Sequence, residues 1–126
     1  MKVWDYLSQK LEKGKLHMTL LDPDKTDPER AGKIAKIAQE AGSCGIMVGG
    51  STGGLGILDA LIKEVKMRAD LPVILFPSGA SLLSRYADAV YFMSLLNSRS
   101  PKYLVEEQLK GVPFIKRCGI EPIPMG

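Results

Sequence analysis

The stretch that decides the fold is LHMTLLDPDKTDPERAGKIAKIAQEAG, residues 16–42. Its apolar start, Leu16 to Leu21, is typical of a short buried strand, and a turn rich in Pro and Asp ends it. Asp27 can cap the helix that follows, and Pro28 suits its first position. Apolar residues then recur at helical spacing until Gly42, which favours a helix end. The stretch is therefore one strand–loop–helix unit.

The same unit recurs along the chain. Further buried strands are predicted at residues 44–48, 73–76 and 89–93, and a fifth is predicted to begin near Ile120. Further helices are predicted from apolar residues at helical spacing: an amphipathic one before Gly14, with Val3, Trp4, Leu7 and Leu11, and one with Leu58, Leu61, Ile62 and Val65 on its buried face. A short helical segment is expected around residues 81–85. The last predicted helix starts at Ser100 and Pro101, has Leu104, Val105 and Leu109 on its apolar face, and ends before Gly111. Strands buried on both faces that alternate with helices belong to parallel sheets, so the fold class is α/β.

Two parallel architectures fit this pattern, a doubly wound sheet and a (β/α)₈ barrel. A barrel takes about 250 residues, and the chain has 126. Residues 1–126 would then form a single domain holding about half of a barrel, with about four βα units and the start of the fifth strand. Because the sequence stops in or just after that strand, we expect a truncated chain.

Composition excludes several classes of protein. A formal net charge of +3, from 17 Lys and Arg against 14 Asp and Glu, is too small for a nucleic-acid-binding tract. No apolar run approaches the roughly 18 residues of a membrane span. The first 14 residues mix charged with apolar side chains, which predicts a cytoplasmic protein rather than a secreted one. Cys44 and Cys118 lack metal-ligand spacing, and we expect free thiols.

Asp22 is the first candidate site residue. It stands where the first predicted strand ends, and the carboxyl ends of parallel strands carry the functional site in sheets and barrels alike. Mg²⁺ prefers one or two protein carboxylates together with substrate phosphates, so Asp22 is a candidate magnesium ligand. The alternative is a polar turn stabilised by local hydrogen bonds of its Asp side chains.

A glycine-rich loop follows the second predicted strand. Its candidate substrate-binding residues are Gly49, Gly50, Ser51, Thr52 and Gly53. Glycines let a ligand approach the backbone, and the helix N-terminus that follows attracts anions, so the loop could hold a phosphate or diphosphate. The loop matches neither known nucleotide-binding pattern. A plain connection between strand and helix is the alternative.

Five segments in this order resemble the geranylgeranylglyceryl phosphate synthase family, in its archaeal branch, to which the bacterial heptaprenylglyceryl phosphate synthases are related. They are HMTLLDPDK (17–25), IMVGGSTG (46–53), VILFPS (73–78), FMSLLNS (92–98) and GIEPIPMG (119–126). The resemblance covers the entire chain. It implies that the chain is the N-terminal half of a TIM-like (β/α)₈ barrel.

The resemblance also implies an activity. The family transfers a geranylgeranyl group from geranylgeranyl diphosphate to the 3-hydroxyl of sn-glycerol 1-phosphate, with Mg²⁺, in the synthesis of archaeal membrane lipids. Carried over to this sequence, the metal ligands are Asp22 and Ser51. The family's glycerol-phosphate loops and its catalytic glutamate lie in the second half of the barrel, so we expect the catalytic residues beyond residue 126 and the 126-residue chain alone to be inactive.

Two other functions stay open at this stage. The chain could belong to another phosphate-handling barrel enzyme, for which only Asp22 and Asp24 could supply an acid–base pair at the strand ends. It could also be a catalytically silent half-barrel, because an open sheet edge invites pairing with a second copy. For the prenyltransferase that the resemblance implies, we expect a homo-oligomer and no nucleic-acid partner.

Overall fold

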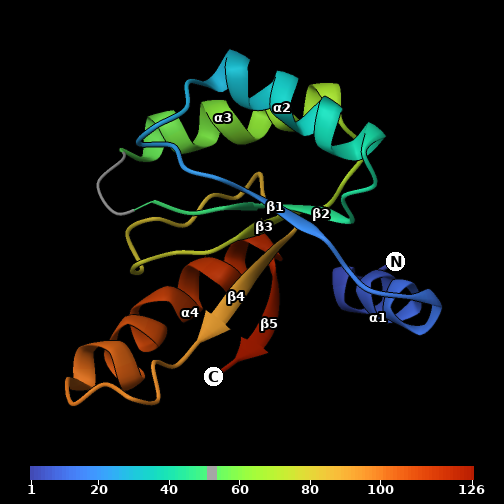
Figure 1. Cartoon of the computed structure of the whole chain (residues 1–126). Helices are drawn as coiled ribbons and strands as arrows, with labels where there is room; N and C mark the ends of the chain where they lie inside the picture. The colour runs from blue at the N-terminus through green and yellow to red at the C-terminus, as the bar shows by residue number, and fades with distance from the viewer. Residues whose placement is uncertain (51–53) are drawn as a thin grey trace.

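The computed structural model describes residues 1–50 and 54–126. Within them lies one parallel sheet with strands β1 (Met18–Leu21), β2 (Gly45–Val48), β3 (Val73–Leu75), β4 (Ala89–Met93) and β5 (Glu121–Met125). The strands are hydrogen-bonded in the order β1-β2-β3-β4-β5, and every pair is parallel (Figure 1). The strands predicted from the sequence are confirmed, with their ends shifted by no more than about two residues.

This strand order decides between the two parallel architectures. A doubly wound sheet reverses its strand order at a switch point, whereas here each strand lies beside the next one along the chain. With right-handed crossovers, the connecting helices then all cover the same face of the sheet. Helices α2 (Pro28–Glu40), α3 (Leu55–Arg68) and α4 (Glu107–Cys118) contribute to a single apolar cluster on that face. The fold is about half of a TIM-like (β/α)₈ barrel.

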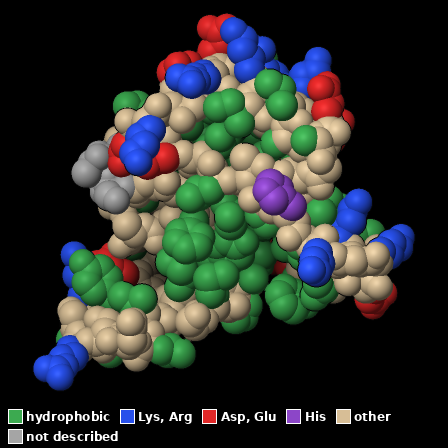
Figure 2. Space-filling model, viewed as in Figure 1, with side chains coloured by type: hydrophobic (Ala, Val, Ile, Leu, Met, Phe, Trp, Pro, Cys, Tyr) green, Lys and Arg blue, Asp and Glu red, His purple; other side chains and the backbone are tan. Residues whose placement is uncertain are grey.

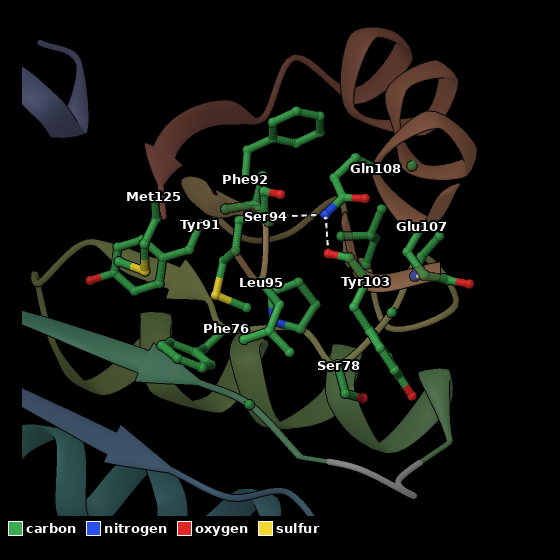
Figure 3. Close-up of a pocket in the computed structure, with 18 of the residues that line it drawn as sticks. Phe76, Ser78, Tyr91, Phe92, Ser94, Leu95, Tyr103, Glu107, Gln108 and Met125 are labelled. Atoms are coloured by element: carbon green, nitrogen blue, oxygen red, sulfur yellow. Dashed lines mark hydrogen bonds between the residues drawn. The ribbon is translucent and has the colours of Figure 1, made fainter. Parts of the chain in front are cut away.

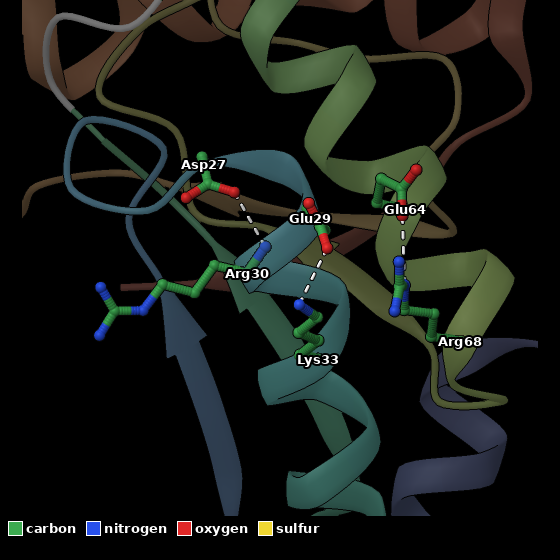
Figure 4. A network of polar contacts seen from close by, with 6 residues as sticks. All are labelled: Asp27, Glu29, Arg30, Lys33, Glu64 and Arg68. Carbon is green, nitrogen blue, oxygen red and sulfur yellow. Dashed lines mark hydrogen bonds and ion pairs between the residues drawn. The ribbon is translucent and has the colours of Figure 1, made fainter.

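The start of α2 follows the capping rule. The Asp27 carboxylate accepts a hydrogen bond from the Arg30 N–H at 2.9 Å, and Pro28 occupies the first helical position. Each of these two helices has an ion pair between residues one turn apart, Glu29–Lys33 on α2 and Glu64–Arg68 on α3 (Figure 4). Exposed pairs of this kind contribute little stability, so the helices depend mainly on their buried faces.

Small side chains bring α2 and α3 close together. Ala31 and Ala35 are fully buried on α2, next to Gly32. A Cβ added at Gly32 would lie 2.9 Å from the Glu64 carbonyl oxygen and 2.7 Å from the Arg68 Cδ. The absence of a side chain at Gly32 therefore sets the distance between these two helices.

The opposite face of the sheet carries a second apolar cluster. Ile74, Ala89, Tyr91 and Ile123 pack there with Val3 of α1 (Val3–Lys13), a helix that the sequence predicted. The Glu121 carboxylate of β5 accepts hydrogen bonds from the first two backbone N–H groups of α1, at 2.6 and 3.1 Å. The first helix of the chain is thus fixed to its last strand, across the amino-terminal end of the sheet.

The connection from β3 to β4 is irregular and contains no helix. The helical segment expected around residues 81–85 is wrong, because the chain forms turns and bends there. Buried Ser84 stabilises them by donating to the Asp59 carboxylate and accepting from the Tyr86 N–H. Leu83 still reaches the core from this irregular segment. Packing is therefore retained without a helix.

The end of the last predicted helix is also corrected. Helix α4 continues past Gly111 and through Pro113 to Cys118, and Gly119 ends it with a left-handed φ of 68°. Gly111 is a packing position, since an added Cβ would lie 3.3 Å from Leu83 Cδ1. The π-helical turn η1 (Lys102–Glu106) precedes α4, and this turn leaves Val105 and Leu109 of the predicted buried face largely exposed. No helix in the described part of the chain is both long and apolar enough to cross a bilayer.

Candidate functional site

A cavity of about 650 Å³ opens at the carboxyl ends of the strands (Figure 3). Residues from the ends of β1 to β5, from the irregular connection after β3 and from the start of α4 line it. Its lining is mostly apolar, with Asp22, Gly49, Gly50 and Ser78 near the β1 and β2 loops. The position agrees with the site predicted from the strand ends.

The carboxylate end of the cavity is built around Asp22. Its Oδ1 accepts the Asp24 N–H at 2.9 Å, in the local turn that the sequence also predicted. A Cβ added at Gly50 would lie 2.9 Å from Asp22 Oδ1 and 3.1 Å from Asp24 Oδ2. Both carboxylates therefore reach the start of the glycine-rich loop, and only glycine leaves room for them there.

Gly49 has a structural role that the sequence did not reveal. A Cβ there would lie 2.3 Å from the Phe76 carbonyl oxygen, so the absence of a side chain lets β2 run close beside the end of β3. Gly49 and Gly50 both line the cavity. The other predicted residues of this loop, Ser51, Thr52 and Gly53, lie outside the described residues.

The loops after β3 and β4 contribute unequally. Ser78 lines the cavity, and its hydroxyl donates to the Gly50 carbonyl at 3.3 Å, which joins the β3 loop to the glycine-rich loop. The polar residues at 97–99, farther along after β4, lie outside the lining, and Ser98 Oγ accepts from the Ser100 N–H at 3.0 Å. Ser98 is not among the lining residues of the described chain.

Aromatic and aliphatic side chains form the body of the cavity. The rings of Phe76 and Tyr91 meet edge to face, with centroids 5.6 Å apart. The Tyr91 hydroxyl contacts Met47 Sδ at 3.4 Å, and burial raises the pKa of this hydroxyl. Leu20 and Phe76 nevertheless remain 56% and 41% exposed. Figure 2 shows apolar side chains gathered in the middle of this face of the molecule, with Lys and Arg around its periphery.

The wall of the cavity formed by η1 and the start of α4 contains residues that sequence analysis missed. Tyr103, Glu107 and Gln108 line the cavity from η1 and the start of α4 (Figure 3). The Glu107 carboxylate accepts the Ala80 N–H at 2.8 Å and pairs with Lys110 at 3.2 Å. The Ala80 N–H and then the Lys110 ammonium hold the pKa of Glu107 below its ordinary value. Nothing in the sequence signals these residues: Tyr103 lies in a π-helical turn, which has no local pattern that distinguishes it from α-helix, and Glu107 and Gln108 meet Ala80 and Met93 only through the fold.

The donor set at the strand ends suits a hard cation better than a soft one. No group of three or more His, Cys, Asp or Glu side chains that could hold a metal is found among the described residues. One or two carboxylates are nevertheless enough protein ligands for Mg²⁺, since it takes its remaining ligands from water and substrate phosphates. Asp22, with Asp24 beside it, fits that requirement.

Comparison with known proteins agrees with this arrangement. The chain is 54% identical over 125 residues to geranylgeranylglyceryl phosphate synthase from Pyrococcus horikoshii, a match that covers 98% of this chain and 49% of the relative. It is 55% identical over 114 residues to the synthase of the same name from Methanothrix thermoacetophila, which covers 90% of this chain and 45% of the relative. The chain thus spans about half the length of the curated relatives it matches.

Solved structures show the same fold. The crystal structure of (S)-3-O-geranylgeranylglyceryl phosphate synthase from Thermoplasma acidophilum, in complex with its substrate sn-glycerol-1-phosphate, matches with a TM-score of 0.93 and 44% identity, over 99% of this chain and 51% of that one. Wild-type GGGPS from Thermoplasma volcanium matches with a TM-score of 0.94 and 43% identity over the same shares. Since residues 8–126 also match the PcrB family, the chain belongs to that family.

Proposed function

We propose that this chain supplies the prenyl diphosphate side of a Mg²⁺-dependent prenyltransferase, which moves a geranylgeranyl group from geranylgeranyl diphosphate to the 3-hydroxyl of sn-glycerol 1-phosphate. The observation that carries the proposal is one cavity in which the Asp22 carboxylate and the start of the glycine-rich loop adjoin a mostly apolar body. A prenyl diphosphate has the same two parts, an anionic head and a long apolar chain. The names of the relatives support the choice of substrates.

The polar end would hold the diphosphate. Asp22 would bind Mg²⁺, and Ser51, which lies outside the described residues, is the second proposed ligand. The ion would neutralise charge that develops on the leaving diphosphate. Gly49 and Gly50 line this end without side chains, so their backbone leaves space for the phosphate oxygens.

The apolar body would hold the prenyl chain and exclude water. Phe76, Tyr91 and Met125 present carbon and sulfur surfaces along the cavity (Figure 3). A dry cavity strengthens electrostatic interactions at its polar end and protects an allylic cation-like centre from hydrolysis. An isomerase of phosphorylated sugars would need polar side chains in place of this lining, which favours the prenyltransferase over that alternative.

The base for the glycerol hydroxyl comes from outside these residues. Glu107 lines the cavity, but the Ala80 N–H and Lys110 hold its pKa low, which makes its carboxylate a weak proton acceptor. Asp22 is assigned to the metal. The 126-residue chain alone should therefore leave the acceptor unactivated, since positioning of the second substrate accounts for about 7–11 kcal/mol of a two-substrate barrier.

Reconstitution tests the proposal. The chain is mixed with the C-terminal half of the Pyrococcus horikoshii synthase and incubated with labelled geranylgeranyl diphosphate, Mg²⁺ and sn-glycerol 1-phosphate. Ether product is expected from the mixture and none from the chain alone. The two halves of the Pyrococcus horikoshii synthase serve as positive control. If that control gives product and the mixture with this chain gives none, the proposed function is wrong.

A further inference from the structure

The π-helical turn η1 contributes Tyr103 to one wall of the cavity and is attached to the end of β4 by its own carbonyl groups. The Tyr103 carbonyl accepts the Leu95 N–H at 3.1 Å, and the Leu104 carbonyl accepts the Ser94 hydroxyl at 2.8 Å. Both acceptors belong to the helix and both donors to the segment that follows β4. The position of this wall therefore depends on contacts between two elements rather than on the helix alone.

Gln108 completes this junction with two further hydrogen bonds. Its Nε2 donates to the Tyr103 carbonyl at 2.9 Å and to the Met93 carbonyl, the last one of β4 (Figure 3). One amide group thus binds η1 and β4 at the same time. Tyr103, the η1 residue that lines the cavity, is fixed through its own carbonyl group.

The oxygen of the same side-chain amide makes no hydrogen bond within the described part of the chain. Gln108 Oε1 is buried and has no hydrogen-bond partner among the described residues. A buried acceptor without a partner costs folding free energy, and an apolar side chain of the same shape would avoid that cost. Glutamine at this position is therefore better explained by the two bonds that its Nε2 donates than by a contribution to overall stability.

We propose that Gln108 is a positioning residue for the prenyl chain, which holds η1 and Tyr103 against the end of β4 so that the apolar wall keeps its shape. This inference rests on the proposed function. Gln108 acts through the backbone carbonyls of Met93 and Tyr103, and neither of its hydrogen bonds involves Asp22 or Gly50. Its loss should weaken binding of the prenyl chain and leave binding of the diphosphate unchanged.

Calorimetric titration of the 126-residue chain with two probes tests this separation. Geranylgeranyl diphosphate reports on the whole cavity, and inorganic diphosphate reports on its polar end, both in the presence of Mg²⁺. The test variant is Gln108→Met, which keeps the length of the side chain and removes its donors. The control is Gln9→Met, the same change at an exposed position of α1, away from the cavity.

Gln108→Met should bind geranylgeranyl diphosphate about tenfold more weakly, with inorganic diphosphate unchanged to within about twofold. Amide hydrogen exchange should also be faster at Leu95, whose N–H binds the Tyr103 carbonyl. Gln9→Met should match the wild-type chain in all three measurements. Equal loss of both ligands would show a merely structural role and overturn the inference.

The remaining outcomes separate this inference from the function on which it rests. Unchanged geranylgeranyl diphosphate binding in Gln108→Met overturns the inference, whatever the exchange rate at Leu95, and leaves the proposed function intact. Weaker binding with unchanged Leu95 exchange overturns it as well, because η1 would not have moved. Failure of the wild-type chain itself to bind geranylgeranyl diphosphate would overturn the proposed function and this inference together.

Discussion

Asp22 and Asp24 stand two residues apart, but they differ in their placement. Asp22 is half-buried at the cavity and Asp24 is exposed, although both reach Gly50. If Asp22 is the principal Mg²⁺ ligand, Asp22→Asn should weaken Mg²⁺-dependent binding of inorganic diphosphate by at least about tenfold, and Asp24→Asn by much less. Titration of both variants with Mg²⁺ present and absent gives the comparison. Equal losses, or none, would remove the assignment.

Gly50 offers a test of the same site without a change of charge. In Gly50→Ala the new methyl group would lie 2.9 Å from Asp22 Oδ1, so the carboxylate must move and Mg²⁺-dependent diphosphate binding should fall. Gly56→Ala is the control, because a Cβ there meets nothing within 4 Å. Unchanged binding in Gly50→Ala would mean that Asp22 does not act from this position.

The lowered pKa of Glu107 makes the folding stability of the chain depend on pH in the acid range. Because its folded-state pKa is lowered, its contribution is fully present above the unfolded-state pKa, about 4.3, and is lost as the pH falls through the folded-state pKa. In Glu107→Gln, the free energy of unfolding should therefore differ less between neutral and acid pH than in the wild-type chain. Urea unfolding at several pH values measures this, with exposed Glu106→Gln as the control. An unchanged pH profile would contradict it.

At the scale of elements, the contact between α2 and α3 depends on Gly32. Gly32→Ala should destabilise the chain by about 1–3 kcal/mol, because the new methyl group would meet the Glu64 backbone, which cannot give way as a side chain can. Lys36→Ala, an exposed change on the same helix, should be nearly neutral. Thermal unfolding of the two variants makes the comparison. A Gly32→Ala variant as stable as the wild-type chain would show that the helices can move apart freely.

Elements with local signals were predictable, and elements set by distant contacts were not. Asp27 and Pro28 predicted the start of α2 correctly, since a cap acts within one turn of the chain. Gly111 was wrongly predicted to end a helix. It packs instead against Leu83, which comes from another segment and leaves little room for a side chain at position 111. The Asp22 end of the cavity followed from its place after β1. Gln108 did not, because Met93 becomes its neighbour only through the fold and its bond to Tyr103 joins it to a π-helical turn that the sequence does not signal.

Prolines in β5 show how an element fits its place in the sheet. The Glu121 N–H bonds to the Asp88 carbonyl, and the Met125 carbonyl accepts the Ser94 N–H, so these alternate residues face β4. Pro122 and Pro124, between them, face the other edge, where a missing N–H costs no bond to β4. The edge opposite β4 therefore offers carbonyl acceptors but no N–H donors at these two positions.

At the scale of the whole molecule, the exposed apolar side chains around the cavity predict that copies of the chain associate with one another. Leu20 and Phe76 are 56% and 41% exposed, and contiguous apolar surface of this kind normally has a partner. Sedimentation velocity of the purified chain should show concentration-dependent dimers or larger species. Addition of the C-terminal half of the Pyrococcus horikoshii synthase should suppress them. A chain that stays monomeric at every concentration would contradict the homo-oligomer that we propose.

The central claim is that one cavity holds the diphosphate at Asp22 and the prenyl chain along the body that leads to Tyr103. Photo-crosslinking tests it most directly, with a geranylgeranyl diphosphate analogue that carries its photoreactive group at the far end of the chain. Mass spectrometry should find the label on the apolar lining between Phe76 and Tyr103, only with Mg²⁺ present, and excess geranylgeranyl diphosphate should displace it. Label on α1 or at the amino-terminal ends of the strands, or label that is indifferent to Mg²⁺, would contradict the account.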